Sequence, residues 1–237
     1  MRVGLTQLEL ENSLDLANGS LTKIESGKVT PSRETLVKVI DRLNLNAHES
    51  ALLLGLSVSK IAGVIDVISD ILVLEDESAI AQKAVNDIPK LLGMLGASFN
   101  LVFGDELRTM AITQTWYTDV LLKVMPFHPT EYTVSLSKDH QNLMVKTINE
   151  GESQYGESLH EFTRPFIPPR VALMLQKTVG VKSMLSVPMI VNKEKVGVII
   201  YAKDQVMDFM DEIPLLNSYT AAVGALIYKT RKHKLDK

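Results

Sequence analysis

The sequence contains no cysteine, a single tryptophan, and no apolar run of the roughly 18 residues that a membrane-spanning helix needs. Without cysteine, the chain can form no disulfide, thiolate metal site, thiol nucleophile or cysteine-linked chromophore. The N-terminus also lacks the basic and apolar segments of a secretory signal. We therefore expect a cytoplasmic protein that does not contact a membrane.

A strong excess of one charge is missing as well. The formal net charge is −3 at pH 7, so any contact with nucleic acid must be local and not spread over a polycationic surface. Hydrophobic residues make up 46% of the chain and charged residues 22%, a balance typical of folded globular proteins. A chain of 237 residues is long enough for two domains, each with its own core.

The pattern of apolar residues predicts a small all-helical domain over residues 1–56 and a helical connector, which is also the expected dimerisation helix, over residues 57–77. In residues 78–237 the period changes to two after the first helix, which indicates strands. The fold class is therefore multidomain, α followed by α/β, with an antiparallel sheet and flanking helices. The elements expected there are hairpins 97–103/107–113 and 183–191/196–203, a strand at 132–136, and helices 78–95, 139–149, 169–177 and 214–232.

Apolar residues between Thr6 and Ile24 have the spacing of a helix-turn-helix, which packs two helices at a steep angle. In this arrangement the second helix projects into the major groove of DNA. We expect its exposed early turns to consist of residues 17–20 with Thr22 and Lys23, because small polar side chains suit base-edge contacts. The apolar positions are Leu10, Leu14, Leu16, Leu21 and Ile24.

Segments 5–7, 24–28 and 31–36 resemble the phage-repressor-like (XRE) helix-turn-helix family. The resemblance implies double-stranded operator DNA as a partner, with Asn18 and Lys23 contacting bases. It implies that Gln7 clamps the DNA backbone and that the loop after the second helix meets phosphate. The complete set of DNA-binding candidates is Gln7, Asn18, Gly19, Ser20, Lys23, Lys28 and Thr30.

The segment departs from the family pattern at three points. Most of the family's first helix, with the arginine that pairs with Glu25, would lie ahead of Met1, where an in-frame extension would restore it. Glu11 replaces a small residue between the two helices, and Asp15 replaces the usual turn glycine, a position that aspartate tolerates better than most residues. Residues 1–56 also carry six basic and seven acidic side chains, which is unfavourable for tight DNA binding.

Segments 96–103, 180–189 and 196–201 resemble the strands and turns of GAF domains. The resemblance implies a small molecule enclosed between the sheet and the variable middle segment, a role in dimerisation, or both. The middle segment offers polar groups for such a pocket, and its arginines would suit an anionic ligand. The candidates for ligand contact are His128, Tyr132, His160, Arg164 and Arg170.

No histidine spacing matches a metal motif, and neither a phosphate-binding glycine loop nor a serine-histidine-acid arrangement is visible. We therefore expect no enzyme activity and identify no cofactor. The main interpretation is a DNA-binding transcriptional regulator whose GAF-like domain senses a small-molecule effector, forms a homodimer, or both. The alternative is a sensor or dimerisation scaffold with a degenerate helix-turn-helix that no longer binds DNA.

Overall fold

The chain divides into two compact units, residues 1–61 and residues 62–237, and each is described by itself. No helix in the described part of the chain is long and apolar enough to cross a membrane. The computed structural model describes residues 5–46, 49–50, 53, 58–115, 118–119, 122–123, 125, 128–131, 133–206, 209 and 212–235.

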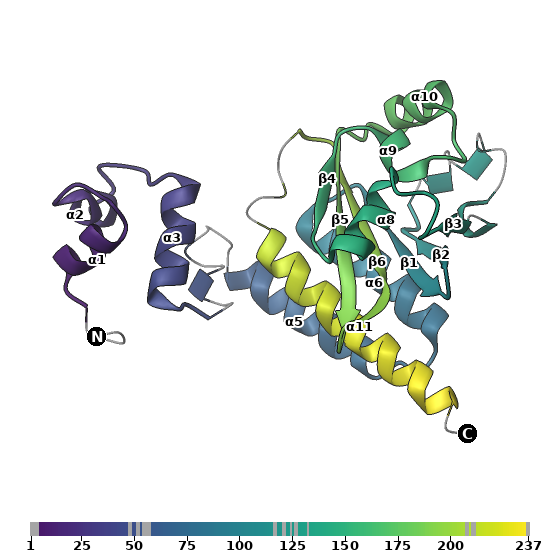
Figure 1. Cartoon of the computed structure of the whole chain (residues 1–237), viewed down its shortest axis with the longest axis horizontal. Coiled ribbons are helices and arrows are strands. Elements are labelled where there is room, and N and C mark those ends of the chain that lie inside the picture. Colours follow the sequence, from purple (N-terminus) through teal and green to yellow (C-terminus); the bar gives the residue numbers. More distant parts are fainter. Residues whose placement is uncertain are drawn as a thin grey trace. The chain divides into compact units, whose positions relative to one another are not determined.

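The first unit is helical over its described residues, as predicted (Figure 1). Its first helix begins at a capping box, in which Thr6 Oγ accepts from the Glu9 N–H and the Glu9 carboxylate accepts from the Thr6 N–H at 2.7 Å. Ser32 caps the third helix through the Thr35 N–H. The helices are α1 (Gln7–Ser13), α2 (Ser20–Glu25) and α3 (Arg33–Leu43).

The turn between α1 and α2 differs from the expectation. Residues 17–19 were expected to open the second helix, but α2 begins only at Ser20. Gly19 precedes it with a φ of 79°, a left-handed conformation that side chains with a Cβ rarely adopt. Asp15 is also left-handed, with a φ of 57°, which confirms that aspartate can take the place of the family's turn glycine.

A six-stranded antiparallel sheet forms the middle of the second unit, in the order β3-β2-β1-β6-β5-β4. Both predicted hairpins, β1–β2 and β5–β6, are confirmed, and they lie side by side because β1 pairs with β6. Asn192 and Lys193, both with positive φ, form the tight turn between β5 and β6. The strands are β1 (Gly96–Phe103), β2 (Glu106–Ile112), β3 (Thr133–Ser135), β4 (Gln154–Gly156), β5 (Ser183–Val191) and β6 (Glu194–Lys203).

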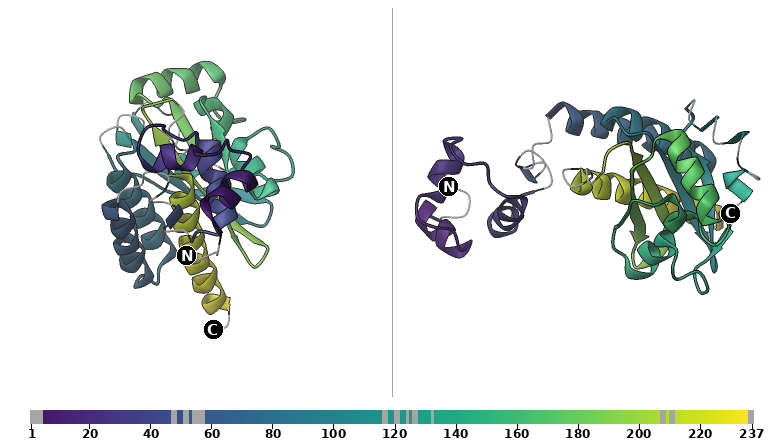
Figure 2. Two further views of the ribbon diagram at one scale, coloured as in Figure 1. Left: turned by 90° about the vertical axis from the view of Figure 1, so that its left-hand side faces the viewer. Right: turned by 90° about the horizontal axis from the view of Figure 1, so that it is seen from above.

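Helices cover both faces of this sheet (Figures 1 and 2). Strand residues alternate between the faces, so Phe99 and Ile199 pack in the core of one face while Val198 packs in the core of the other. On the first face lie α5 (Val58–Leu72), α6 (Glu77–Leu92) and α11 (Ile213–Leu235). On the second face lie α8 (Leu143–Glu150), α9 (Leu159–Thr163) and α10 (Pro169–Val179), with the short 3-10 helix η1 (Pro129–Glu131) at the side of β2.

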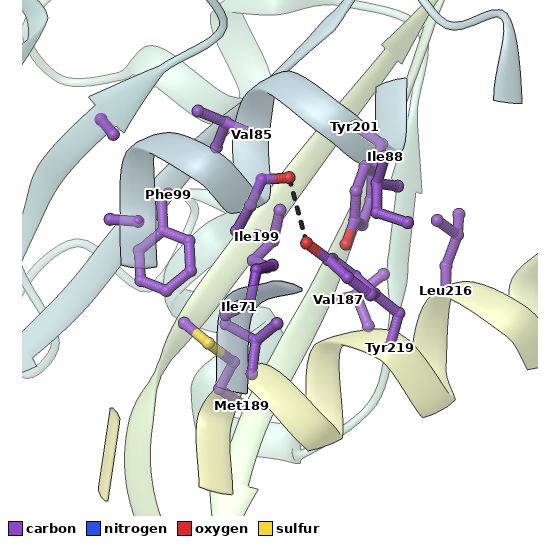
Figure 3. Close-up of a cluster of buried hydrophobic side chains, with 14 of the residues drawn as sticks. Ile71, Val85, Ile88, Phe99, Val187, Met189, Ile199, Tyr201, Leu216 and Tyr219 are labelled. Carbon is purple, nitrogen blue, oxygen red and sulfur yellow. Dashed lines mark hydrogen bonds between the residues drawn. The ribbon is translucent and has the colours of Figure 1, made fainter. Parts of the chain in front are cut away.

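The core of the first face contains two buried tyrosines (Figure 3). The Tyr219 hydroxyl donates to the Ala84 carbonyl at 3.2 Å, and the Tyr201 hydroxyl lies 2.9 Å from Thr220 Oγ. Burial raises the pKa of both tyrosine hydroxyls above the ordinary value. This core therefore joins α6, the sheet and α11 through neutral hydrogen bonds as well as apolar packing.

Candidate functional site

Glu11 is buried in the helix-turn-helix unit with 3% of its surface exposed. Its two carboxylate oxygens accept hydrogen bonds from the backbone N–H groups of Gly19, at 2.9 Å, and Leu21, at 2.7 Å. The first amides of a helix have no partner within the helix, and they favour a negative charge. The glutamate that departs from the small-residue pattern therefore caps the shortened helix α2.

The predicted DNA-binding residues surround this cap. Gln7 Nε donates to Thr22 Oγ at 3.0 Å and to the Glu25 carboxylate at 3.4 Å, so it ties the start of α1 to α2. Asn18 lies in the turn before α2 and Lys23 lies on α2, and both side chains are exposed. Gly19 and Ser20 are half-buried, whereas Lys28 and Thr30 are exposed in the segment between α2 and α3.

A cavity of about 210 Å³ lies on the second face of the sheet. Strands β1, β2 and β6 supply its floor, and Phe162 of α9 and Leu175 of α10 lie in its wall. Thr115 and Thr118, from the segment that follows β2, complete the wall on another side. Most of its lining is apolar, and no lining residue in the described part of the chain is charged.

A strip of polar side chains crosses the floor of the cavity. The β1–β2 register shifts between Phe99 and Asn100, which sets Thr109 opposite Asn100. Thr109 Oγ donates to Asn100 Oδ1 at 2.7 Å, and Asn100 Nδ2 donates to Ser98 Oγ at 3.2 Å. The strip thus satisfies the buried amide while it presents two hydroxyl groups, those of Ser98 and Thr109, among the lining residues.

The segment after β2 connects the cavity wall to α6. Thr113 Oγ donates to the Val85 carbonyl at 2.5 Å and accepts from the Ala97 N–H at 2.6 Å. The Gln114 N–H donates to Asn86 Oδ1 at 2.9 Å. Two residues further along the chain from Thr113, Thr115 Oγ is buried and has no hydrogen-bond partner among the described residues.

The two histidine candidates lie elsewhere than in the cavity lining. His128 Nδ1 is 2.7 Å from Thr130 Oγ, on the exposed turn before η1. His160 Nδ1 is 2.8 Å from the Ile167 carbonyl, an interaction that braces the loop after α9. Both rings thus have local structural partners, and a role in ligand contact stays a prediction.

The arginine candidates do not line the cavity either. Arg164 Nη1 donates to Gln141 Oε1 at 3.3 Å, and Arg170 is exposed at the start of α10; neither is among the residues that line the cavity. Tyr132 lies outside the described residues. The polar floor of the cavity was not predicted, although Ser98 and Asn100 are polar residues in the otherwise apolar segment 96–103.

Within the described residues, no three histidine, aspartate or glutamate side chains are grouped so as to hold a metal ion. The arrangement instead offers an apolar cavity in one unit and exposed polar side chains around a capped helix in the other.

Comparisons with known proteins agree with this division. A family model described as helix-turn-helix matches residues 1–49. No curated protein matches the sequence. Among solved structures, a GAF domain from an Acinetobacter phosphoenolpyruvate-protein phosphotransferase is 16% identical, with a TM-score of 0.55 over 75% of this chain and 98% of that chain.

Two further solved structures are similar to a comparable share of the chain. The GAF domain of the corresponding Coxiella burnetii phosphotransferase is 10% identical, with a TM-score of 0.56 over 75% of this chain and 97% of that chain. The free methionine-R-sulfoxide reductase of Neisseria meningitidis, solved with its substrate, is 13% identical, with a TM-score of 0.52 over 73% of this chain and 91% of that chain. The chain therefore carries an N-terminal helix-turn-helix domain followed by a domain with the GAF fold.

Proposed function

We propose that the protein is a DNA-binding transcriptional regulator whose GAF domain senses a small molecule. The observation that carries the proposal is the cavity of about 210 Å³ in a chain that also holds a helix-turn-helix domain. Catalysis has no support from the residues of the cavity, because their side chains offer hydroxyl and amide groups but no acid, base or charged nucleophile.

The hydrogen bonds around Thr113 supply a route from the cavity to the helices. A ligand that displaces Thr115 would strain the nearby bonds of Thr113 to Val85 and of Gln114 to Asn86, both on α6. Since α6 shares its core with α5 and α11, a shift of α6 would displace these two helices as well. We propose that this is how ligand occupancy changes DNA binding.

A mobility-shift assay with genomic fragments, including the DNA ahead of the protein's own gene, tests the DNA-binding role. The Asn18→Ala, Lys23→Ala double variant should lose roughly 10- to 100-fold in affinity, because contacts to base edges are worth about 1–3 kcal/mol. Lys38→Ala is the matched control, since Lys38 is exposed on α3 and its replacement also removes one positive charge. Equal affinities of the double variant and the control would refute the assignment of Asn18 and Lys23.

A second candidate function is a sensor or scaffold that does not bind DNA. It is favoured by the start of α2 at Ser20, which removes the first turn of the helix expected to contact bases, and by the acidic balance of residues 1–56. Failure of the wild-type protein to retain any genomic fragment at low salt would support this function over the first one.

We propose in addition that the protein is a homodimer through α5. Val64 and Ile71 are buried in the core of the second unit, but Ile65 and Leu72 are 58% and 57% exposed. Their seven-residue spacing places both on one side of α5, as in a helix that pairs with its own copy. Light scattering should show a dimer for wild type and a monomer for Ile65→Glu, Leu72→Glu; a monomeric wild type would refute the proposal.

A further inference from the structure

We infer that the GAF-domain cavity takes a small, uncharged and mostly apolar molecule of about eight or nine non-hydrogen atoms, held by one hydrogen-bonding group. The inference rests on the proposed sensing function and specifies the chemistry of its ligand. Three features of the cavity carry it: the composition of its lining, its volume and the placement of its hydroxyl groups.

The lining decides the charge of the ligand. Leu107, Met144, Phe162, Leu175 and Ile200 present aliphatic, thioether and aromatic surface, and the lining residues in the described part of the chain include no lysine, arginine, histidine, aspartate or glutamate. An ion buried against such surface would lose its hydration without gaining a partner of opposite charge. A carboxylate, phosphate or ammonium group on the enclosed part of the ligand is therefore excluded.

The volume decides the size of the ligand. An apolar protein cavity of about 150 Å³ holds benzene, with its six carbon atoms. At the same ratio, a cavity of about 210 Å³ holds about eight or nine non-hydrogen atoms. The volume therefore sets the size of the part of the ligand that the cavity encloses.

The hydroxyl groups decide the orientation. Ser98 Oγ accepts a hydrogen bond from Asn100 Nδ2, which leaves its own O–H to donate. Thr109 Oγ uses its proton on Asn100 Oδ1, which leaves its lone pairs to accept. The two hydroxyls thus offer a donor and an acceptor on the floor, a pairing that matches one alcohol, phenol or amide group on an otherwise apolar molecule.

The test uses the full-length protein and two probes of similar size, 4-methylphenol, which is neutral, and benzoate, which is charged. Calorimetric titration should show saturable binding of 4-methylphenol to wild type and at least tenfold weaker binding of benzoate. Ser98→Ala should weaken 4-methylphenol binding roughly three- to tenfold through loss of one hydrogen bond. Ala202→Phe should abolish binding, because Ala202 lies in the lining of the cavity and the added ring would fill it.

Ala79→Phe is the matched control, since Ala79 is exposed on α6 and the same ring there leaves the cavity unchanged. Circular dichroism establishes that each variant is folded, and Ser98→Ala keeps the test decisive if the larger substitution disrupts the sheet. Benzoate binding as tight as that of 4-methylphenol, unchanged binding in Ala202→Phe, or no saturable binding of either probe would overturn the inference.

These outcomes are distinct from failure of the proposed function. If 4-methylphenol binds as expected while DNA affinity is the same with and without it, the coupling between the domains is refuted and the ligand class stands. If benzoate binds in the cavity and alters DNA affinity, the ligand class is refuted and the sensing function stands.

Discussion

Replacing Glu11 with alanine would remove both oxygen atoms that cap helix α2. The amides of Gly19 and Leu21, now bonded at 2.9 Å and 2.7 Å, would then have no carboxylate partner. A hydrogen bond to a charged group contributes about 1.5–3 kcal/mol, and relief of the buried charge offsets part of the loss of two such bonds. We expect a net loss of about 2 kcal/mol in the local stability of the helix-turn-helix unit, which is in the upper part of the range known for helix caps.

Amide hydrogen exchange followed by mass spectrometry measures this loss directly. A loss of about 2 kcal/mol should speed exchange of the Gly19 and Leu21 amides by about 30-fold. Glu11→Gln, which keeps one acceptor oxygen without the charge, should lie between alanine and wild type.

Glu34→Ala is the control, because Glu34 is an exposed carboxylate on α3 that pairs with Lys38. It should leave the exchange of the α2 amides unchanged. If Glu11→Ala also leaves that exchange unchanged, Glu11 does not cap α2, and the left-handed Gly19 must be held by other contacts.

Three further predictions concern the GAF domain. Thr113→Val should lower the free energy of unfolding by about 2 kcal/mol in urea titrations, because the Val85 carbonyl and the Ala97 amide lose a buried partner. The control Thr178→Val, on the exposed side of α10, should have a much smaller effect. Stability should fall as the pH rises above the ordinary tyrosine pKa of 10.0, because the unfolded chain then releases protons that the buried tyrosines retain. Tyr201→Phe should lessen this fall in thermal melts at alkaline pH. An unchanged pH dependence in the variant would contradict the prediction. Lys203→Met should lower the free energy of unfolding by about 3 kcal/mol, because Lys203 and Glu212 form a buried ion pair with side chains 10% and 8% exposed. The double variant Lys203→Met, Glu212→Met should recover part of that loss. No recovery in the double variant would refute the pairing.

The sheet could be predicted from the sequence because its main determinants are local. Alternating apolar residues define the strands of each hairpin, and short turns such as Asn192–Lys193 connect neighbouring strands. The helix-turn-helix was predictable for the same reason, since Leu14 and Leu21 occur at the expected offsets and are both buried.

The start of α2 was not predictable from local pattern. Residues 17–19 have helix-compatible spacing, but the carboxylate of Glu11, eight residues before Gly19, holds the Gly19 amide in a left-handed turn. From sequence alone, Glu11 appeared only as an oversized substitute for a small residue. Its capping role depends on how closely α1 and α2 approach each other, and a short sequence segment does not reveal that contact.

The sequence by itself determined the division into a helical and an α/β domain, because hydrophobic periodicity is a property of neighbouring residues. Only the tertiary structure decided what the second domain can hold. Ser98 and Thr109 come together through strand register, and side chains from α9 and α10, 50 or more residues further along the chain, line the cavity above them. Cavity walls depend on long-range packing, so the residues that line this cavity could not be identified from neighbouring positions in the sequence.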